Sequence, residues 1–575
     1  MRSFRFSPAL PPRPAVTGGD LLIILVIAAL LYAGIRLSVH APEVIAGPNI
    51  TLSYRALPWY VLLSTGRMLI AYLLSLLFTL AYGYTAARNR SAERVLMPLL
   101  DVLQSVPILS FLPVVLLSLA VILPVGMAAE LAAIVLIFTS QAWNMTYSFY
   151  QSISTIPTEL REAAAIFRLN PWLRFKTVEL PFAAVGLIWN SMMSWAGGWF
   201  FLMASEIFTV GSRDFRLPGI GAYLHTAASA GNLQAVAAGT FTLVLTIIAL
   251  DQLIWRPILA WAEKFKLETV ASEHPPRSWL RDILARSWLV EQFRNRLISP
   301  MADWIDSRVG RRWEAGTQRQ HRDQGASGAS TVLWALGIAA GLPALYGVFQ
   351  MSLMLRSLSL HEYADIGVGL LATLLRVVVA LFVALLWTVP AGVAIGTNRK
   401  LANLLQPIVQ VAASVPATAL FPVLLLALLQ APGGLDIAAV VLMLMGTQWY
   451  LLFNVIAGTV AIPQDLRDTT ALLQLSRRDR WRTLFLPSLF PYLVTGAITA
   501  SGGAWNASIV AEHAEFGGRV LATTGIGSLI ARATGRGDYP LLLGATLGLV
   551  LAVVTINRFF WRWLYRIAEE HYRME

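Results

Sequence analysis

Long apolar stretches with few charged residues recur along the whole 575-residue chain. A helix that crosses a lipid bilayer needs about 20 consecutive, mostly apolar residues. The first half contains these segments: Asp20–Ile35, Trp59–Ala87, Pro98–Leu123, Gly126–Tyr150, Pro181–Val210 and Leu233–Trp255. The second half contains these: Thr331–Leu355, Gly367–Thr397, Leu404–Leu429, Leu435–Ile456, Pro487–Glu512 and Tyr539–Phe560. The sequence therefore predicts an all-α polytopic membrane protein with about twelve transmembrane helices.

The composition excludes several other classes of protein. Only 13% of the residues are charged, whereas a soluble domain has roughly 25%. So few charges cannot cover a water-facing surface, which excludes an ordinary soluble enzyme, and the 57% hydrophobic content excludes a disordered chain. The chain has no cysteine, so disulfides, thiolate metal sites and iron–sulfur clusters are excluded. The net charge of +12 predicts basic cytoplasmic loops beside membrane lipid rather than nucleic-acid binding.

The basic residues also predict the orientation of the chain. Arginine and lysine concentrate after the second, fourth and sixth segments, for example at Arg88 and Arg174. Because basic loops stay in the cytoplasm, both termini are predicted to be cytoplasmic. The first segment follows Arg2 and Arg5 as in a signal peptide, but no clear small-residue cleavage site follows it. We therefore expect a retained helix.

An internal repeat divides the chain into two halves. Ser105-Val106-Pro107 recurs 309 residues later, as Ser414-Val415-Pro416. After a small deletion the separation becomes 306 residues. Pairs at this separation are Pro157 and Pro463, Arg161 and Arg467, Pro181 and Pro487, Trp199 and Trp505, Glu206 and Glu512, and Gly219-Ile220-Gly221 and Gly525-Ile526-Gly527. Because each copy has an even number of spans, both copies have the same orientation, as two parallel six-helix repeats.

The repeat predicts three regions. The first domain covers residues 1–262, a cytoplasmic linker covers 263–330, and the second domain covers 331–575. The linker mixes charges of both signs and ends in the sequence Gly325-Ala326-Ser327-Gly328-Ala329-Ser330, which is typical of a flexible tether. We expect a partly helical segment near the bilayer surface; a regulatory or partner-docking role is the alternative.

The loop between the fourth and fifth spans of each copy carries the most specific motif. Its residues are Glu159, Arg161, Glu162, Ala163 and Ala164 in the first copy, and Asp465, Arg467, Asp468, Thr469 and Thr470 in the second. The pattern predicts two short helices joined by a turn. Thr158 can cap the first helix, and Asn170, followed by Pro171, can start the second. Ser476 takes the place of Asn170 in the second copy.

This loop resembles the EAA loop of ATP-binding-cassette (ABC) importer permeases. The family pattern is E-A-A, then a glycine four residues after the last alanine, then I-x-L-P. The matching residues are Glu162-Ala163-Ala164, Val178, Leu180 and Pro181 in the first copy, and more loosely Asp468-Thr469-Thr470, Leu484, Leu486 and Pro487 in the second. The family glycine is absent from both copies, where Arg168 and Gln474 stand instead. The resemblance therefore identifies the loop but does not predict the geometry of its turn.

The resemblance covers nearly the whole chain, as two fused permease domains with the fold of a type I ABC importer. The sequences Ala204-Ser205-Glu206 and Gly219-Ile220-Gly221 are closest to the nitrate, sulfonate, taurine and bicarbonate branch. A permease of this branch is expected to move a small anion or a sulfonate-, nitrate- or taurine-like solute across the bacterial cytoplasmic (inner) membrane by alternating access.

The resemblance also implies the partners. In the family each such loop forms a coupling helix that docks in a groove of an ABC ATPase subunit. Two separate ATPase subunits would bind ATP and Mg²⁺, and a periplasmic or lipid-anchored substrate-binding protein would deliver the solute. Because both permease domains are fused, one chain is expected to form the membrane part of each transporter.

No catalytic or metal site is expected in the chain itself. The G-x-x-x-x-G-K-[ST] pattern that cradles ATP phosphates is absent, and the 7 histidines are scattered. We therefore expect a non-enzymatic chain without its own cofactor. The alternative is a secondary transporter of the major facilitator type, driven by an ion gradient. That class expects an Asp-Arg motif between the second and third spans, and the loop from Gly83 to Arg90 lacks it.

Two interpretations are open for the polar residues within the predicted spans. The residues are Arg67, Arg376, Ser105, Ser414, Glu206, Glu512, Trp199 and Trp505. In the first interpretation they line a translocation path, and the arginines attract an anion, since an intramembrane charge costs about 2.5–3.5 kcal/mol to insert and should face protein or water. In the second they are structural: Arg67 pairs with Glu206, the prolines kink helices for packing, and the tryptophans pack.

Overall fold

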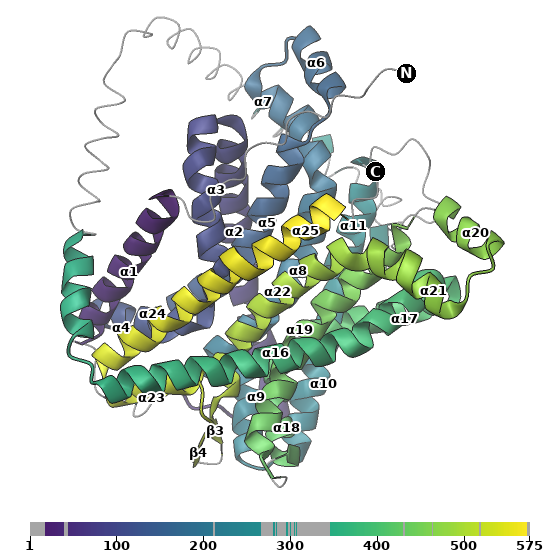
Figure 1. Cartoon of the computed structure of the whole chain (residues 1–575). Coiled ribbons are helices and arrows are strands. Elements are labelled where there is room, and N and C mark those ends of the chain that lie inside the picture. Colours follow the sequence, from purple (N-terminus) through teal and green to yellow (C-terminus); the bar gives the residue numbers. More distant parts are fainter. Residues whose placement is uncertain are drawn as a thin grey trace, which may run out of the picture.

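The computed structural model describes residues 18–39, 44–210, 213–265, 345–428, 432–462, 464–516 and 519–571, together with isolated positions between 280 and 306. These residues are helical except for loops and two short antiparallel hairpins (Figure 1). The expected all-α fold with apolar, membrane-length helices in two repeated halves is therefore confirmed.

The first half contains these elements: α1 (Gly18–Ser38), η1 (Tyr54–Ala56), α2 (Leu57–Arg88), α3 (Arg90–Ser105), η2 (Ile108–Phe111), α4 (Leu112–Ile122), α5 (Val125–Ser154), α6 (Thr158–Ile166), α7 (Pro171–Arg174), η3 (Phe175–Glu179), α8 (Leu180–Glu206), β1 (Thr209–Val210), β2 (Arg213–Asp214), α9 (Ile220–Ser229), α10 (Leu233–Leu250), η4 (Asp251–Trp255), α11 (Arg256–Ala262) and η5 (Glu263–Phe265).

The described part of the second half repeats this order. After a short apolar helix (Leu345–Leu355) come α16 (Leu360–Thr397), α17 (Arg399–Ser414), α18 (Ala417–Leu428), α19 (Gly434–Val460), α20 (Gln464–Leu472), α21 (Arg477–Arg480), η7 (Trp481–Phe485), α22 (Leu486–Ala511), β3 (His513–Phe516), β4 (Arg519–Ala522), α23 (Ile526–Arg536), α24 (Tyr539–Thr555), η8 (Ile556–Trp561) and α25 (Arg562–His571).

The expected count of twelve spans is not reached in the described residues. Seven helices are long and apolar enough to cross a membrane, or eight if one bent pair is counted as a span. The predicted first and seventh spans are represented by short apolar helices (Ala28–Ser38 and Leu345–Leu355), and residues 331–344 of the seventh lie outside the described part. The fifth, α8, has 27 residues, but polar residues such as Asn190 and Ser191 interrupt its apolar sequence.

The predicted third and ninth spans are broken rather than merely kinked. α3 ends at Ser105, Val106 is extended, and the chain resumes as η2 and α4 after a bend of 84°. α17 likewise ends at Ser414 before an extended Val415. The residue before a proline is disfavoured in the helical region, and proline itself lacks an N–H, so each Val-Pro pair ends its helix. The side chains of Ser105 and Ser414 lie outside the described residues.

Each half is built on three long helices that pack in chain order. α2 packs against α5 and α5 against α8, as α16 packs against α19 and α19 against α22. Small residues allow the close approach: an added Cβ on Gly83 would lie 2.8 Å from the Phe149 ring, and Thr79 is within hydrogen-bond distance of Thr146 (3.0 Å). Such small-residue interfaces are typical of membrane helices. The halves also contact each other where the Tyr539 hydroxyl donates to the Ser38 carbonyl.

α8 and α22 point toward the same end of the molecule, because they line two cavities in the same order along their lengths. Their C-terminal ends both line one cavity, and residues about two turns earlier in each helix both line a second cavity. A helix of this length extends about 40 Å, so α6–α7 and α20–α21, which precede the two helices, lie at one end of the molecule. We call this the loop end. The opposite hairpin end carries β1–β2, β3–β4, α9 and α23 (Figure 1).

Candidate functional site

An ion cluster stands where α8 reaches the hairpin end of the first half. The Glu206 carboxylate is fully buried and accepts hydrogen bonds from Arg67 Nη1 (2.8 Å) and from the Ser64 hydroxyl (2.6 Å). Arg67 also makes a bidentate pair with Glu130 on α5 (2.6 and 2.7 Å) and donates to the Pro218 carbonyl. These contacts join α2, α5 and α8 to the segment that leads into α9, and we call them the first ion cluster.

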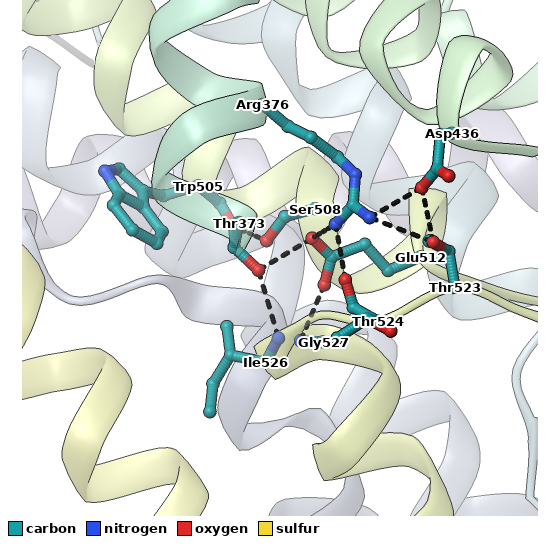
Figure 2. Close-up of polar contacts among 10 residues, drawn as sticks. All are labelled: Thr373, Arg376, Asp436, Trp505, Ser508, Glu512, Thr523, Thr524, Ile526 and Gly527. Atoms are coloured by element: carbon teal, nitrogen blue, oxygen red, sulfur yellow. Dashed lines mark hydrogen bonds and ion pairs between the residues drawn. The ribbon is translucent and has the colours of Figure 1, made fainter. Parts of the chain in front are cut away.

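The second half repeats the arrangement (Figure 2). Arg376 Nη1 lies 2.9 Å from the buried carboxylate of Glu512, which also accepts from the Thr373 hydroxyl (2.7 Å). Arg376 Nη2 pairs with Asp436 (2.6 Å), and Arg376 Nη1 donates to the Thr524 carbonyl (2.7 Å). This second ion cluster differs in one respect: Asp436 accepts through one oxygen and shares it with Thr523.

The Gly-Ile-Gly sequences allow a helix to begin directly against each carboxylate. Glu206 accepts from the backbone N–H of Gly221 (2.7 Å), and Glu512 accepts from that of Gly527 (2.9 Å). A Cβ on Gly219 would lie 2.2 Å from Glu206 Oε1, so only glycine leaves room for the carboxylate. A buried anion at a helix N-terminus is favoured by the free N–H groups there. The cluster thus ties α9, and in the second half α23, to the helix core.

The structure places the predicted path residues in these clusters and in the packed core. Arg67 and Glu206 are ion-paired, as are Arg376 and Glu512. Trp199 and Trp505 are buried in the hydrophobic cores of the two halves. None of these six residues lines either of the two cavities found in the described part of the molecule. The ion pairs that the structural interpretation expects are thus present, and a role of these residues in a translocation path stays a prediction.

The larger cavity, of about 290 Å³, lies between the halves at the hairpin end, and we call it the vestibule. Matching positions from both copies line it. The pairs separated by 306 residues are Ala204 and Val510, Ile207 and His513, Phe208 and Ala514, and His225 and Ala531; the pairs separated by 309 residues are Leu109 and Thr418, and Leu112 and Phe421. The vestibule therefore lies on the internal pseudo-twofold axis. Arg532 and Arg536 also line it.

A smaller cavity of about 90 Å³ lies further toward the loop end. Gly197 and Phe200 of α8 line it together with their counterparts, Gly503 and Asn506 of α22. Asn506 also accepts a hydrogen bond from the backbone N–H of Leu109, in the broken third span of the other half (3.3 Å). The two cavities thus follow the interface between the copies. The sequence analysis missed their lining because most of these residues are ordinary apolar residues.

The two loops at the loop end have the predicted helix–turn–helix form. Asn170 caps α7 by accepting from the Leu173 N–H (2.8 Å), and Ser476 caps α21 by accepting from the Asp479 N–H (3.2 Å). The expected cap at Thr158 is wrong: the N-cap of α6 is Pro157, which makes no side-chain cap hydrogen bond. η3 and η7, both π-helical, then connect the second short helices to α8 and α22.

Most of the predicted coupling residues lie on the surface, but the arginines do not point away from the protein. Glu159, Glu162, Asp465 and Asp468 are exposed, whereas Ala164 is buried. Arg161 donates to the carbonyls of Ile153 and Ser154 at the end of α5, and Arg467 donates to that of Thr459 near the end of α19. Each arginine therefore fixes its loop to a long helix by binding carbonyls that the helix leaves unpaired.

The turn after α6 and α20 is left-handed although it lacks glycine. Arg168 has φ 48° and Gln474 has φ 47°, the only positive values among described non-glycine residues. The backbone N–H of Leu169 bonds to the Ala164 carbonyl, and that of Leu475 to the Thr470 carbonyl, as in a Schellman cap. This conformation costs about 1–2 kcal/mol for each side chain that must adopt it.

Apolar residues are exposed at the tip of each loop, immediately after the motif. Ile166 and Phe167 are 79% and 76% exposed, and their counterparts Leu472 and Leu473 are 83% and 65% exposed. Large apolar side chains beside charged groups at a protein end are typical of a protein-binding surface. The sequence analysis overlooked this pair, although two apolar residues follow the motif in both copies.

The loop of the first half has polar supports that the second loop lacks. The buried Glu179 carboxylate forms ion pairs with Arg88, at the end of α2, and with Arg174 of α7. In the second half Phe485 stands at the position of Glu179 and Thr397 at that of Arg88. Asp306 of the linker accepts from Trp172 Nε1 (2.8 Å) and pairs with Lys176. Those hydrogen bonds, the one from Lys176 foremost, lower the pKa of the Asp306 carboxyl.

No group of three or more potential metal ligands occurs among the residues that the structure describes.

Comparison with known proteins identifies a family. The family described as "Binding-protein-dependent transport system inner membrane component" matches the chain twice, over residues 49–254 and 388–573. Both matches include the loop motif of their half. The first also includes the whole first ion cluster, whereas the second includes Asp436 and Glu512 but begins after Arg376.

Individual relatives carry names of related transporters. The chain is 29% identical over 147 residues to the nitrate import permease protein NrtB of Synechocystis sp., which is 26% of this chain and 52% of that protein. It is 33% identical over 165 residues to the bicarbonate transport system permease protein CmpB of Synechocystis sp., 27% of this chain and 57% of that one. It is 26% identical over 164 residues to the taurine transport system permease protein TauC of Escherichia coli, 28% and 56% respectively. The chain thus spans between half and two thirds of the length of these relatives.

Proposed function

The chain belongs to the family of binding-protein-dependent transport system inner membrane components, and from this premise we propose that it is the fused, two-domain permease of an ABC importer. One chain supplies both permease domains of the transporter, bounded at about residues 1–262 and 331–575. Family membership does not favour the alternative of a secondary transporter. The nitrate, bicarbonate and taurine permeases among its relatives support a small anion or sulfonate as its solute.

The observation that carries this proposal is the pair of similar loops at one end of the molecule. Each loop begins at the end of a long helix, is fixed to it by an arginine (Arg161 or Arg467), and presents two exposed apolar side chains. A docking surface that occurs twice, on the same end, fits two copies of a partner related by the same pseudo-twofold axis. We assign that partner as two ABC ATPase subunits, which bind ATP and Mg²⁺.

The orientation follows from this assignment. The loop end faces the cytoplasm, where ATP is available, and both termini are cytoplasmic. The hairpin end faces the periplasm, where a substrate-binding protein delivers the solute to the vestibule. The chain contributes no catalytic residue and no cofactor of its own.

Transport uses the interface between the halves. When ATP closes the two ATPase subunits, they move the loops, and α8 and α22 carry this movement to the cavities that they line. The ion clusters keep α9 and α23 attached to those helices, so each half moves as one body. ATP drives the change because it binds one of the two states more tightly.

The test is ATP-driven uptake in proteoliposomes that contain the chain, its ATPase and its binding protein. Nitrate, bicarbonate and taurine serve as the solutes tested. The variants are Phe167→Asp, Leu473→Asp and both together. We expect the double variant to lose co-purification of the ATPase and at least 90% of uptake, because each charge would have to be buried in the partner's groove, at a cost of about 2 kcal/mol or more.

The control variant is Phe241→Ser, which removes a side chain of similar exposure (70%) from α10, away from the loops. It should retain ATPase binding. ATPase association and uptake that both survive the double loop variant would contradict the proposal, as would uptake that needs an ion gradient and no ATP.

A further inference from the structure

The titratable side chains that line the vestibule are all basic. They are Arg532 and Arg536 of α23, His513 of β3 and His225 of α9. No aspartate or glutamate occurs among the described residues that line it, and most of the remaining wall is apolar. In a cavity with apolar walls the field of fixed charges is screened less than at an open surface, so the vestibule favours negatively charged solutes.

Two carboxylates that lie next to lining residues in the chain, Glu206 and Glu512, do not offset this charge. Glu206 and Glu512 are fully buried, and each already accepts hydrogen bonds from an arginine, a hydroxyl group and a backbone N–H of its own ion cluster. Neither carboxylate lines the vestibule. Arg532 and Arg536 are exposed, and no salt bridge is found for either of them within the described part of the chain.

The two arginines of the vestibule come from only one half. Arg532 and Arg536 are four residues apart on α23, so they lie on the same face of that helix. At the corresponding positions of the first half stand Thr226, in α9, and Ala230, which follows the end of α9. A lining that is otherwise related by the pseudo-twofold axis therefore carries its two permanent charges on one side. Duplication alone would place a counterpart of each arginine in the other half. The ion clusters and the packing of the long helices do not involve these arginines.

We propose that the vestibule is an anion-binding site in which Arg532 and Arg536 hold a small oxyanion between the two halves. The guanidinium group is planar and donates paired hydrogen bonds that match the edge of a planar oxyanion. A cavity of about 290 Å³ has room for such an ion and some water. This inference rests on the proposed function, since it assigns the contact that the solute makes after leaving a binding protein.

The natural absence of cysteine allows a direct test on the purified full-length chain, without ATPase or binding protein. Ala514→Cys places a thiol in the vestibule wall, on strand β3, which contacts α23. The measurement is the ratio of its reaction rates with an anionic and a cationic methanethiosulfonate reagent. It is repeated with Arg532→Gln and Arg536→Gln together, with both arginines changed to lysine, and with Arg55→Gln, an exposed arginine outside the vestibule.

We expect the anionic reagent to be favoured, and the ratio to fall about tenfold in the double glutamine variant, because two charges act on reagents of opposite sign. The lysine and Arg55→Gln variants should keep the ratio. Sodium nitrate or sodium bicarbonate, at an ionic strength held constant with gluconate, should slow the labelling of Ala514→Cys, and the double glutamine variant should lose this protection.

A ratio that does not change when both arginines are removed would overturn the proposal, and so would the absence of protection by both anions. Because no ATPase takes part, either failure would leave the coupling assignment intact. Failure of coupling in the uptake assay would likewise leave this electrostatic measurement unaffected.

Discussion

Arg67 in the first half and Arg376 in the second occupy equivalent positions and bind equivalent carboxylates, but their surroundings differ. The Arg67 side chain is 4% exposed and donates to Glu130 through two nitrogens. The Arg376 side chain is 12% exposed and donates to Asp436 through one nitrogen. Some features occur in one half only: the Glu179 ion pairs occur in the first, and the vestibule arginines occur in the second. The ion clusters and the arginines that fix each loop to a long helix are present twice, whereas the additional ion pairs of the first loop and the arginines of the vestibule are present once.

The largest effect is expected when the central carboxylate of each ion cluster is removed. Glu206→Leu should lower the free energy of unfolding by about 3–5 kcal/mol, because it breaks a buried ion pair from one side. Glu512→Leu should cost less, about 2–3 kcal/mol, because Arg376 is nearer to water. Unfolding in mixed detergent micelles measures both. The double variant Arg67→Met with Glu206→Leu should recover part of the loss.

A second test concerns the loop supports, where the halves differ. Glu179→Leu should loosen the first loop and lower the free energy of unfolding by about 1–2 kcal/mol. The effect is moderate because Arg88 and Arg174 lose a buried partner but are themselves partly exposed. Hydrogen exchange should quicken in α6–α7 and stay unchanged in α20–α21. The matched change Phe485→Leu should cost no more than about 1 kcal/mol. Equal effects in both loops would mean that the ion pairs do not distinguish them.

A third test targets the left-handed turn that both halves share. Arg168→Gly and Gln474→Gly should each stabilise their loop by about 0.5–1 kcal/mol, because glycine adopts this conformation without steric cost. Slower hydrogen exchange in α6 and in α20 would report the gain. Faster exchange in either loop would show that its side chain contributes more than the strain costs.

The smallest expected effect is that of the linker contact, which the described residues show for the first loop only. Asp306→Asn should weaken it by less than about 1 kcal/mol, because the pair is partly exposed. Since the pKa of Asp306 is lowered, the contact is fully present above the ordinary aspartate pKa of about 3.9 and is lost as the pH falls through the lowered value. Protease cleavage of the linker at pH 5 and pH 7 should therefore be alike in the parent chain.

The repeat made much of this architecture predictable from the sequence. Residues that recur at a fixed separation, such as Glu206 and Glu512, have equivalent partners, Arg67 and Arg376. The Ser-Val-Pro triplets end helices, as expected from a proline that lacks a backbone N–H. Residues present in one copy only gave no such signal. Glu179 is replaced by phenylalanine, and Arg532 by threonine, in the other half. Their roles depend on which elements meet in space, and periodicity and motif spacing do not encode that.

The central claim is that two equivalent loops face the ATPase side of the membrane together, and cysteine labelling tests it most directly. Glu162→Cys and Asp468→Cys are matched, exposed positions in an otherwise cysteine-free chain, and Ser357→Cys, just before α16, marks the hairpin end. A membrane-impermeant maleimide is applied to right-side-out and to inside-out vesicles. We predict that both loop cysteines react only in inside-out vesicles, and Ser357→Cys only in right-side-out ones. Loop cysteines that react from opposite sides would contradict the account.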